Sequence, residues 1–134
     1  MFTTNEIAVL KVAIKAYVVV MKDTADTAYA EAQKTNSAED WGILQSAAAN
    51  TERAIHLQNI DLAMIHGMDR QWLGTLSQAA TTQFEIQDDT ILDFDAPNSM
   101  ITLATVQYEL QKRINDLVYL SSAIGKMTAW LSIK

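Results

Sequence analysis

The sequence predicts an all-α protein, an elongated helical bundle of three long amphipathic helices with one acidic linker. Apolar residues recur every three or four positions over long stretches, a spacing that places them on one face of a helix. The 134-residue chain holds only four glycines and one proline, so it offers few sites for turns. Its length suits one core, and we expect a single domain over residues 1–134.

The first helix is expected over residues 4–34, because its start carries two capping signals. Thr3 and Glu6 have the spacing of a capping box, and Phe2 and Ile7 have the spacing of a hydrophobic staple. Apolar residues then follow at helical spacing as far as Met21. These features predict a helix that begins sharply and packs one continuous face into a core.

Three valines widen the apolar surface of this helix beyond that face, namely Val9, Val12 and Val19. Charged residues make up only 19% of the chain, against about 25% in typical soluble domains. A bundle of this size has little room to hide additional apolar helix surface. We therefore expect the three valines to lie in a contact with another subunit.

The second helix is expected over residues 38–67. Ser37 and Asp40 form a variant of the capping box, and the short connection before them forces an antiparallel hairpin with the first helix. Gly67 interrupts the pattern, so the chain either bends there or stops and restarts at Asp69. A helical segment over residues 69–84 follows in either case.

Residues 85–98 form the expected acidic linker, and the last helix is expected over residues 99–132. Apolar side chains stand between carboxylates in the linker, a pattern that suits a docking strip for a basic partner; the strip consists of Asp88, Asp89, Leu92, Asp93, Phe94 and Asp95. At the far end of the last helix, Trp130 points away from the apolar face that carries Leu131. We predict Trp130 to be an interface anchor.

The end of the chain also carries a set of short motifs: Pro97, Met100 and Leu103 at intervals of three, then Gln107, Ser121, Ser122 and Lys126. This segment resembles the last helix of the needle and inner-rod subunits of type III secretion systems. The resemblance covers residues 97–134 and implies a subunit of a larger assembly.

The sequence lacks the residue patterns that are typical of enzymes and of metal-binding sites. Glu52 and His56 share one helix face and could supply two metal ligands, but His66 lies on another face and the chain has no cysteine. Asp93 and Asp95 lack the glycine and the terminal glutamate of a calcium loop. No nucleophile elbow or phosphate-binding loop occurs. We expect no catalytic, cofactor-binding or metal-binding residues, and no enzyme.

Charge and hydropathy indicate whether the chain binds nucleic acid or enters a membrane. The net charge is −6 and the longest basic run is Lys112–Arg113, which argues against nucleic acid. Lys11 and Lys15 interrupt the apolar segment 7–21, so we predict neither a signal peptide nor a membrane span. The expected location is the cytoplasm or a macromolecular assembly, without direct membrane insertion.

These observations predict a non-enzymatic assembly subunit that forms homo-oligomers through apolar helix faces, as in a filament, a secretion apparatus or a virion. The alternative is an adaptor, chaperone or inhibitor that holds a specific protein partner, for which the acidic strip is the best evidence.

Overall fold

The computed structural model describes residues 1–67, 69–93 and 103–133, apart from the side chains of His66 and Leu103. The described chain is all-α, which confirms the predicted fold class. Its elements are α1 (Thr4–Thr35), α2 (Ala38–Leu57), the short 3-10 helix η1 (Leu62–Gly67), α3 (Arg70–Asp89) and α4 (Leu103–Ser132). The prediction of three long helices is wrong, because the described residues form four α-helices.

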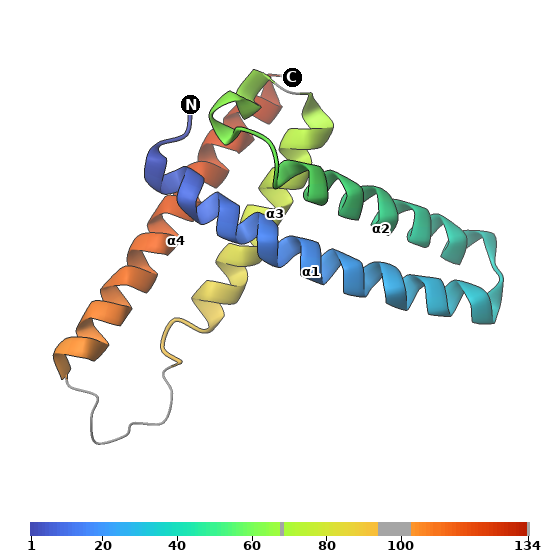
Figure 1. Ribbon diagram of the computed structural model, residues 1–134, viewed down its shortest axis with the longest axis horizontal. Coiled ribbons are helices and arrows are strands. Elements are labelled where there is room, and N and C mark those ends of the chain that lie inside the picture. The colour runs from blue at the N-terminus through green and yellow to red at the C-terminus, as the bar shows by residue number, and fades with distance from the viewer. Residues whose placement is uncertain (68, 94–102, 134) are drawn as a thin grey trace.

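The four α-helices form two antiparallel hairpins that cross (Figure 1). Helices α1 and α2 make the first hairpin, and α3 and α4 make the second. The N-terminal half of α1 packs across the second hairpin, whereas the far ends of α1 and α2 project beyond it. The two hairpins thus form a crossed arrangement in place of the predicted elongated three-helix bundle.

The start of α1 is fixed by the predicted capping box. Thr3 has extended backbone dihedral angles and its Oγ1 accepts a hydrogen bond from the Glu6 backbone N–H at 3.2 Å, while Glu6 Oε1 accepts one from the Thr3 N–H at 2.7 Å. Two of the four free N–H groups at the helix start are thereby satisfied. The backbone is thus committed to a helix from Thr4 onward.

The tight connection between α1 and α2 also follows from local chemistry. Asn36 adopts the left-handed conformation at φ 49°, which asparagine tolerates better than most residues, and its N–H donates to the Ala32 carbonyl. Ser37 then caps α2 by accepting from the Asp40 N–H at 3.1 Å. The chain therefore reverses within two residues, and α2 runs back along α1.

The core lies where the two hairpins cross. Its largest side chains are almost completely buried and come from all five elements: Leu10, Ile14, Leu57, Leu62, Ile65, Leu73, Leu76, Leu120 and Met127. Burial of such a side chain contributes about 1.5–3 kcal/mol, so this cluster is the main source of stability. A smaller cluster around Tyr17 and Ala54 continues the core a short way between α1, α2 and α3.

Two predicted helix boundaries are wrong. Helix α2 ends at Leu57 instead of continuing to residue 67, and a separate 3-10 helix carries Leu62 and Ile65 into the core. Helix α3 continues to Asp89, so the first part of the expected linker 85–98 is helical. Residues 94–98 of that linker and residues 99–102 of the expected last helix lie outside the described residues. In the described chain, no helix combines the length and the apolar character needed to cross a membrane.

Candidate interaction surface

The projecting half of the first hairpin consists of two helices with no third layer over them (Figure 1). Several of its apolar side chains are exposed, most clearly Val19 at 59% and Ile43 at 52%. On another side, Tyr29 and Trp41 meet edge to face at 6.5 Å, and both remain partly open to solvent. This part of the chain therefore presents apolar side chains that neither α3 nor α4 covers.

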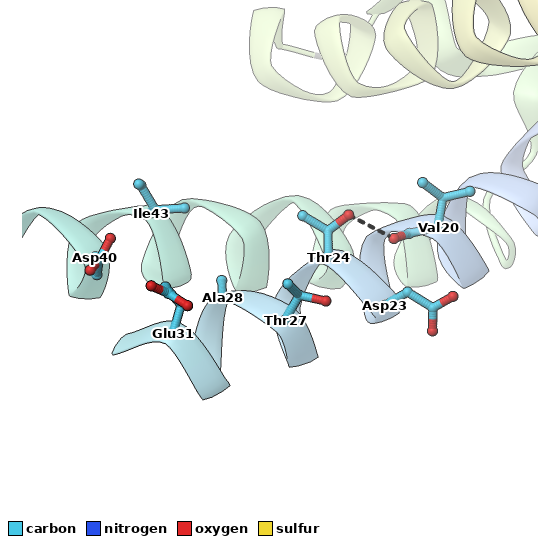
Figure 2. A pocket seen from close by; sticks show the side chains of 8 residues that line it. All are labelled: Val20, Asp23, Thr24, Thr27, Ala28, Glu31, Asp40 and Ile43. Atoms are coloured by element: carbon cyan, nitrogen blue, oxygen red, sulfur yellow. Dashed lines mark hydrogen bonds between the residues drawn. The ribbon is translucent and has the colours of Figure 1, made fainter. Parts of the chain in front are cut away.

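A groove runs between α1 and α2 in this projecting half, with a volume of about 550 Å³ (Figure 2). We call it the hairpin groove, and its lining consists of Val20, Asp23, Thr24, Thr27, Ala28 and Glu31 from α1 with Asp40 and Ile43 from α2. The Thr24 hydroxyl donates to the Val20 carbonyl at 2.9 Å. Its polar atom is thus satisfied within the helix, and methyl groups dominate the middle of the groove.

The charged side chains of the hairpin groove are all acidic. Asp23 and Glu31 come from α1, and Asp40 comes from the first turn of α2, where the Thr35 hydroxyl donates to its carboxylate. No lysine or arginine is part of this lining. The groove therefore combines apolar side chains with carboxylates, and all its charges are negative.

A second exposed surface lies on α1 itself, on the face opposite Leu10 and Ile14. Val12 and Val19 are two turns apart on this face and are 55% and 59% exposed. Exposed lysines follow one edge of the same face, and together with the two valines they form what we call the α1 ridge: Lys11, Val12, Lys15, Val19 and Lys22. The ridge therefore combines an apolar stripe with a positive edge.

Two other predicted contact residues lie against the core. Val9 is half-buried and packs against the crossing cluster. Trp130 is also half-buried, and its ring meets Phe2 edge to face at 5.1 Å. Because Phe2 is itself buried, Trp130 helps to hold the start of the chain against the end of α4.

The described part of the predicted acidic strip lies at the end of α3, on the opposite side of the crossing from the projecting ends of α1 and α2 (Figure 1). Asp88, Asp89 and Asp93 are exposed, and Leu92 is 72% exposed. Phe94 and Asp95 lie outside the described residues. Arg113 of α4 donates hydrogen bonds to the carbonyls that follow α3, those of Thr90, Ile91 and Asp93. A cation therefore lies against the backbone of the strip.

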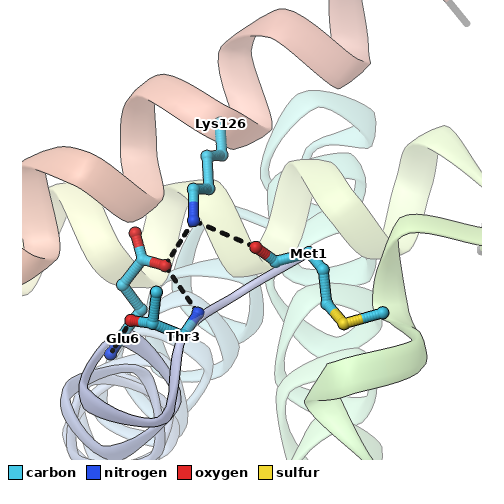
Figure 3. A network of polar contacts seen from close by, with 4 residues as sticks. All are labelled: Met1, Thr3, Glu6 and Lys126. Atoms are coloured by element: carbon cyan, nitrogen blue, oxygen red, sulfur yellow. Dashed lines mark hydrogen bonds and ion pairs between the residues drawn. The ribbon is translucent and has the colours of Figure 1, made fainter.

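An ion pair between a buried carboxylate and a partly exposed lysine joins α1 to α4 (Figure 3). Lys126 Nζ lies 2.6 Å from Glu6 Oε1 and donates a second hydrogen bond to the Met1 carbonyl at 2.9 Å. Glu6 is only 1% exposed, and its other oxygen, Oε2, has no hydrogen-bond partner of normal geometry. The capping box predicted the local role of Glu6, but nothing in the local sequence links it to Lys126.

The pKa of Glu6 reflects opposing effects. Burial alone raises the pKa, but the hydrogen bonds from Lys126 and from Thr3, with the nearby Ser122 side chain, lower it more strongly. The net result is a pKa lowered from 4.5 to about 2, so the carboxylate stays charged near neutral pH. The arrangement holds the chain start in place and exposes no reactive atom, so we assign it a structural role.

The candidate metal ligands do not assemble in the described structure. His56 Nε2 and Glu52 Oε1 are 3.8 Å apart on an exposed face of α2, and the His56 ring meets Trp72 edge to face. The side chain of His66 lies outside the described residues. Among the described residues, no group of three or more His, Cys, Asp or Glu side chains could hold a metal ion.

Comparison with known proteins gives no relative: no protein-family model, no curated protein and no solved structure matches this chain.

Proposed function

We propose that this protein is a non-enzymatic structural subunit that associates with further copies of itself through exposed apolar faces of α1 and the first hairpin. The observation that carries the proposal is the pair Val12 and Val19. Both lie on one face of α1, and both are more than half exposed although the chain has a well-filled core elsewhere. An apolar stripe at regular helical spacing is typical of a helix face that another helix covers.

The energetic argument favours association. Each square ångström of apolar surface removed from water contributes about 25 cal/mol. Ile43 and Val20 add to the apolar surface of the same hairpin, so one contact covers several such side chains at once. The loss of translational and rotational entropy on association opposes this gain. The difference between the two free energies sets the affinity.

Light scattering on the size-fractionated full chain tests the proposal. We expect particles of several times the chain mass of 14.9 kDa at tens of micromolar protein. The double substitution of Val12 and Val19 by Ser should shift the population to the monomer. A strict monomer of the wild-type chain at these concentrations would refute the proposal.

A matched control comes from α4, where Val118 is 57% exposed on another face of the molecule. The Val118→Ser chain should associate like the wild type. Circular dichroism shows whether each variant remains folded, since substitutions at exposed positions usually change stability by less than about 0.5 kcal/mol. Loss of association in the Val118→Ser chain alone would place the contact on α4 instead of α1 and would contradict the proposal.

A second candidate function is that of an adaptor, chaperone or inhibitor for a basic protein. The exposed Leu92 between Asp89 and Asp93 favours it, because an apolar anchor flanked by carboxylates suits a lysine-rich or arginine-rich surface. Replacement of Asp88, Asp89, Asp93 and Asp95 by Asn should abolish capture of such a partner by the tagged full chain and leave self-association intact. Undiminished capture would count against this candidate.

A further inference from the structure

We propose that the hairpin groove of one copy receives the α1 ridge of a second copy, so that the chains join head to tail. This inference rests on the proposed self-association and specifies its geometry. The groove and the ridge are different surfaces, and a contact between unlike surfaces of identical chains is heterologous. Such contacts build rings or open filaments instead of closed two-fold dimers.

The chemistry of the hairpin groove sets the requirements for its occupant. The groove is lined by apolar side chains, among them Val20 and Ile43, and by three carboxylates. An occupant that fits must therefore present an apolar stripe with cations along its edge, because like charges at such a contact would oppose binding. A helix that carries these features in line is the occupant that a groove between two helices accommodates best.

The α1 ridge meets these requirements. Its apolar stripe consists of Val12 and Val19, and its positive edge consists of Lys11, Lys15 and Lys22. In the part of the chain that the structure describes, none of the three lysines forms an ion pair. The charges of the ridge and of the groove are thus opposite in sign and both open to solvent.

The lengths of the two surfaces also agree. At a rise of about 1.5 Å per residue, the lysines from Lys11 to Lys22 extend over about 16 Å. On the same basis, the acidic residues of α1 from Asp23 to Glu31 extend over about 12 Å. Two or three of the cations can therefore lie beside the carboxylates of the groove at the same time.

A single chain cannot make this contact with itself. The ridge and the α1 side of the groove lie on adjoining, partly overlapping stretches of one continuous helix, and this helix would have to fold back for them to meet. A second copy brings its α1 across the two-helix end of the hairpin. It thereby supplies the third layer that α3 and α4 supply at the crossing.

Charge reversal tests the contact. The groove variant carries Asp23→Lys and Glu31→Lys, and the ridge variant carries Lys11→Glu, Lys15→Glu and Lys22→Glu. We expect either variant alone to associate at least about tenfold more weakly than the wild type in light scattering, and an equimolar mixture to recover association. The Lys112→Glu chain, altered on α4, should associate normally.

Cysteine crosslinking tests the geometry, because the natural chain contains no cysteine. A mixture of the Val19→Cys chain and the Ile43→Cys chain should form a mixed disulfide dimer under mild oxidation, in excess over either self-linked dimer. Dominant self-linking of the Val19→Cys chain would overturn the proposal in favour of a two-fold contact.

The outcomes separate this inference from the function on which it rests. If the groove variant loses association and the ridge variant keeps it, the occupant of the groove is not the ridge. This result would overturn the inference. Association that responds to Val12 and Val19 but to neither charge reversal would overturn the head-to-tail contact and preserve the proposed function. A monomeric wild-type chain would refute both.

Discussion

The ion pair between the buried Glu6 and the partly exposed Lys126 makes the stability of this protein fall at acid pH. The Glu6 pKa is lowered from 4.5 to about 2 in the folded chain. Because each pH unit of difference between folded and unfolded pKa values is worth about 1.36 kcal/mol, the folded state gains about 3 kcal/mol near neutral pH. Lys126 is one-third exposed, and solvent screening reduces this figure to about 2–3 kcal/mol.

The direction of the pH dependence follows from the lowered pKa. The contribution of Glu6 is fully present above pH 4.5 and is lost as the pH falls toward 2, because the unfolded chain takes up the proton first. The Glu6→Gln chain keeps the capping hydrogen bond with the Thr3 N–H but carries no charge. It should lose about 2–3 kcal/mol at pH 7 and almost nothing at pH 2 relative to the wild type.

The Lys126→Met chain should lose more than the Glu6→Gln chain at pH 7, about 3–5 kcal/mol. The reason is the difference in burial: Glu6 is 1% exposed and would keep a charge without its partner, whereas the Lys126 ammonium can still reach water. The loss of unfolding free energy in the Lys126→Met chain should become smaller at low pH, where Glu6 becomes neutral.

Urea denaturation followed by circular dichroism between pH 2 and pH 7 measures these differences, at protein concentrations low enough to exclude association. The Glu85→Gln chain, altered at an exposed position of α3, is the control and should follow the wild type. Parallel curves for the wild-type and Glu6→Gln chains across this pH range would refute the reasoning. So would a smaller loss for Lys126→Met than for Glu6→Gln at pH 7.

Three further predictions concern packing and local stability. Leu76→Ala, at a completely buried position of the crossing, should cost about 2–5 kcal/mol in urea denaturation, whereas Ile86→Ala at an exposed position of the same helix should cost far less. Gly74→Ala should stabilise α3 by about 0.5–1 kcal/mol, since its added methyl group meets no atom within 4 Å, and a lower melting temperature would contradict this. Backbone amides of residues 24–33 should exchange hydrogen faster than those of residues 8–18 in the monomer, and uniform protection along α1 would contradict the two-layer description.

The sequence predicts those parts of the fold that depend on neighbouring residues. Thr3 with Glu6, and Ser37 with Asp40, identify two helix starts because capping acts over three residues. The first hairpin follows from the short connection between α1 and α2. The all-α class follows from the long stretches at helical spacing.

The end of α2 illustrates why helix boundaries are harder to predict. Leu62 and Ile65 continue the apolar spacing of α2, but they do so from a 3-10 helix, in which positions three apart also share a face. Periodicity alone does not separate these two cases. Asp61 distinguishes them, because its carboxylate accepts a hydrogen bond from the Ala63 N–H and closes a turn before the 3-10 helix.

The far end of α3 depends on a partner distant in the chain. The sequence predicts an end at residue 84, followed by an acidic linker, and acidic residues in a last helical turn are unfavourable because they oppose the helix dipole. In the structure the guanidinium of Arg113 donates to the carbonyls of Thr90, Ile91 and Asp93 and offsets that disadvantage. The helix consequently continues to Asp89, through a contact with α4 that no local pattern reveals.

The same distinction applies to the candidate interaction surface. Val12 and Val19 can be found from helical spacing alone, since both lie on one helix, and we name them from the sequence. The hairpin groove requires α1 and α2 in a definite register, because Asp40 and Ile43 of α2 complete a lining that begins with Asp23 and Glu31 of α1. A surface shared by two helices depends on how they pack, and packing is fixed by the core at the crossing.

Trp130 shows the converse: its sequence position suggests an exposed anchor, but Phe2 lies against its ring. The arrangement of the two hairpins therefore decides which apolar side chains remain exposed.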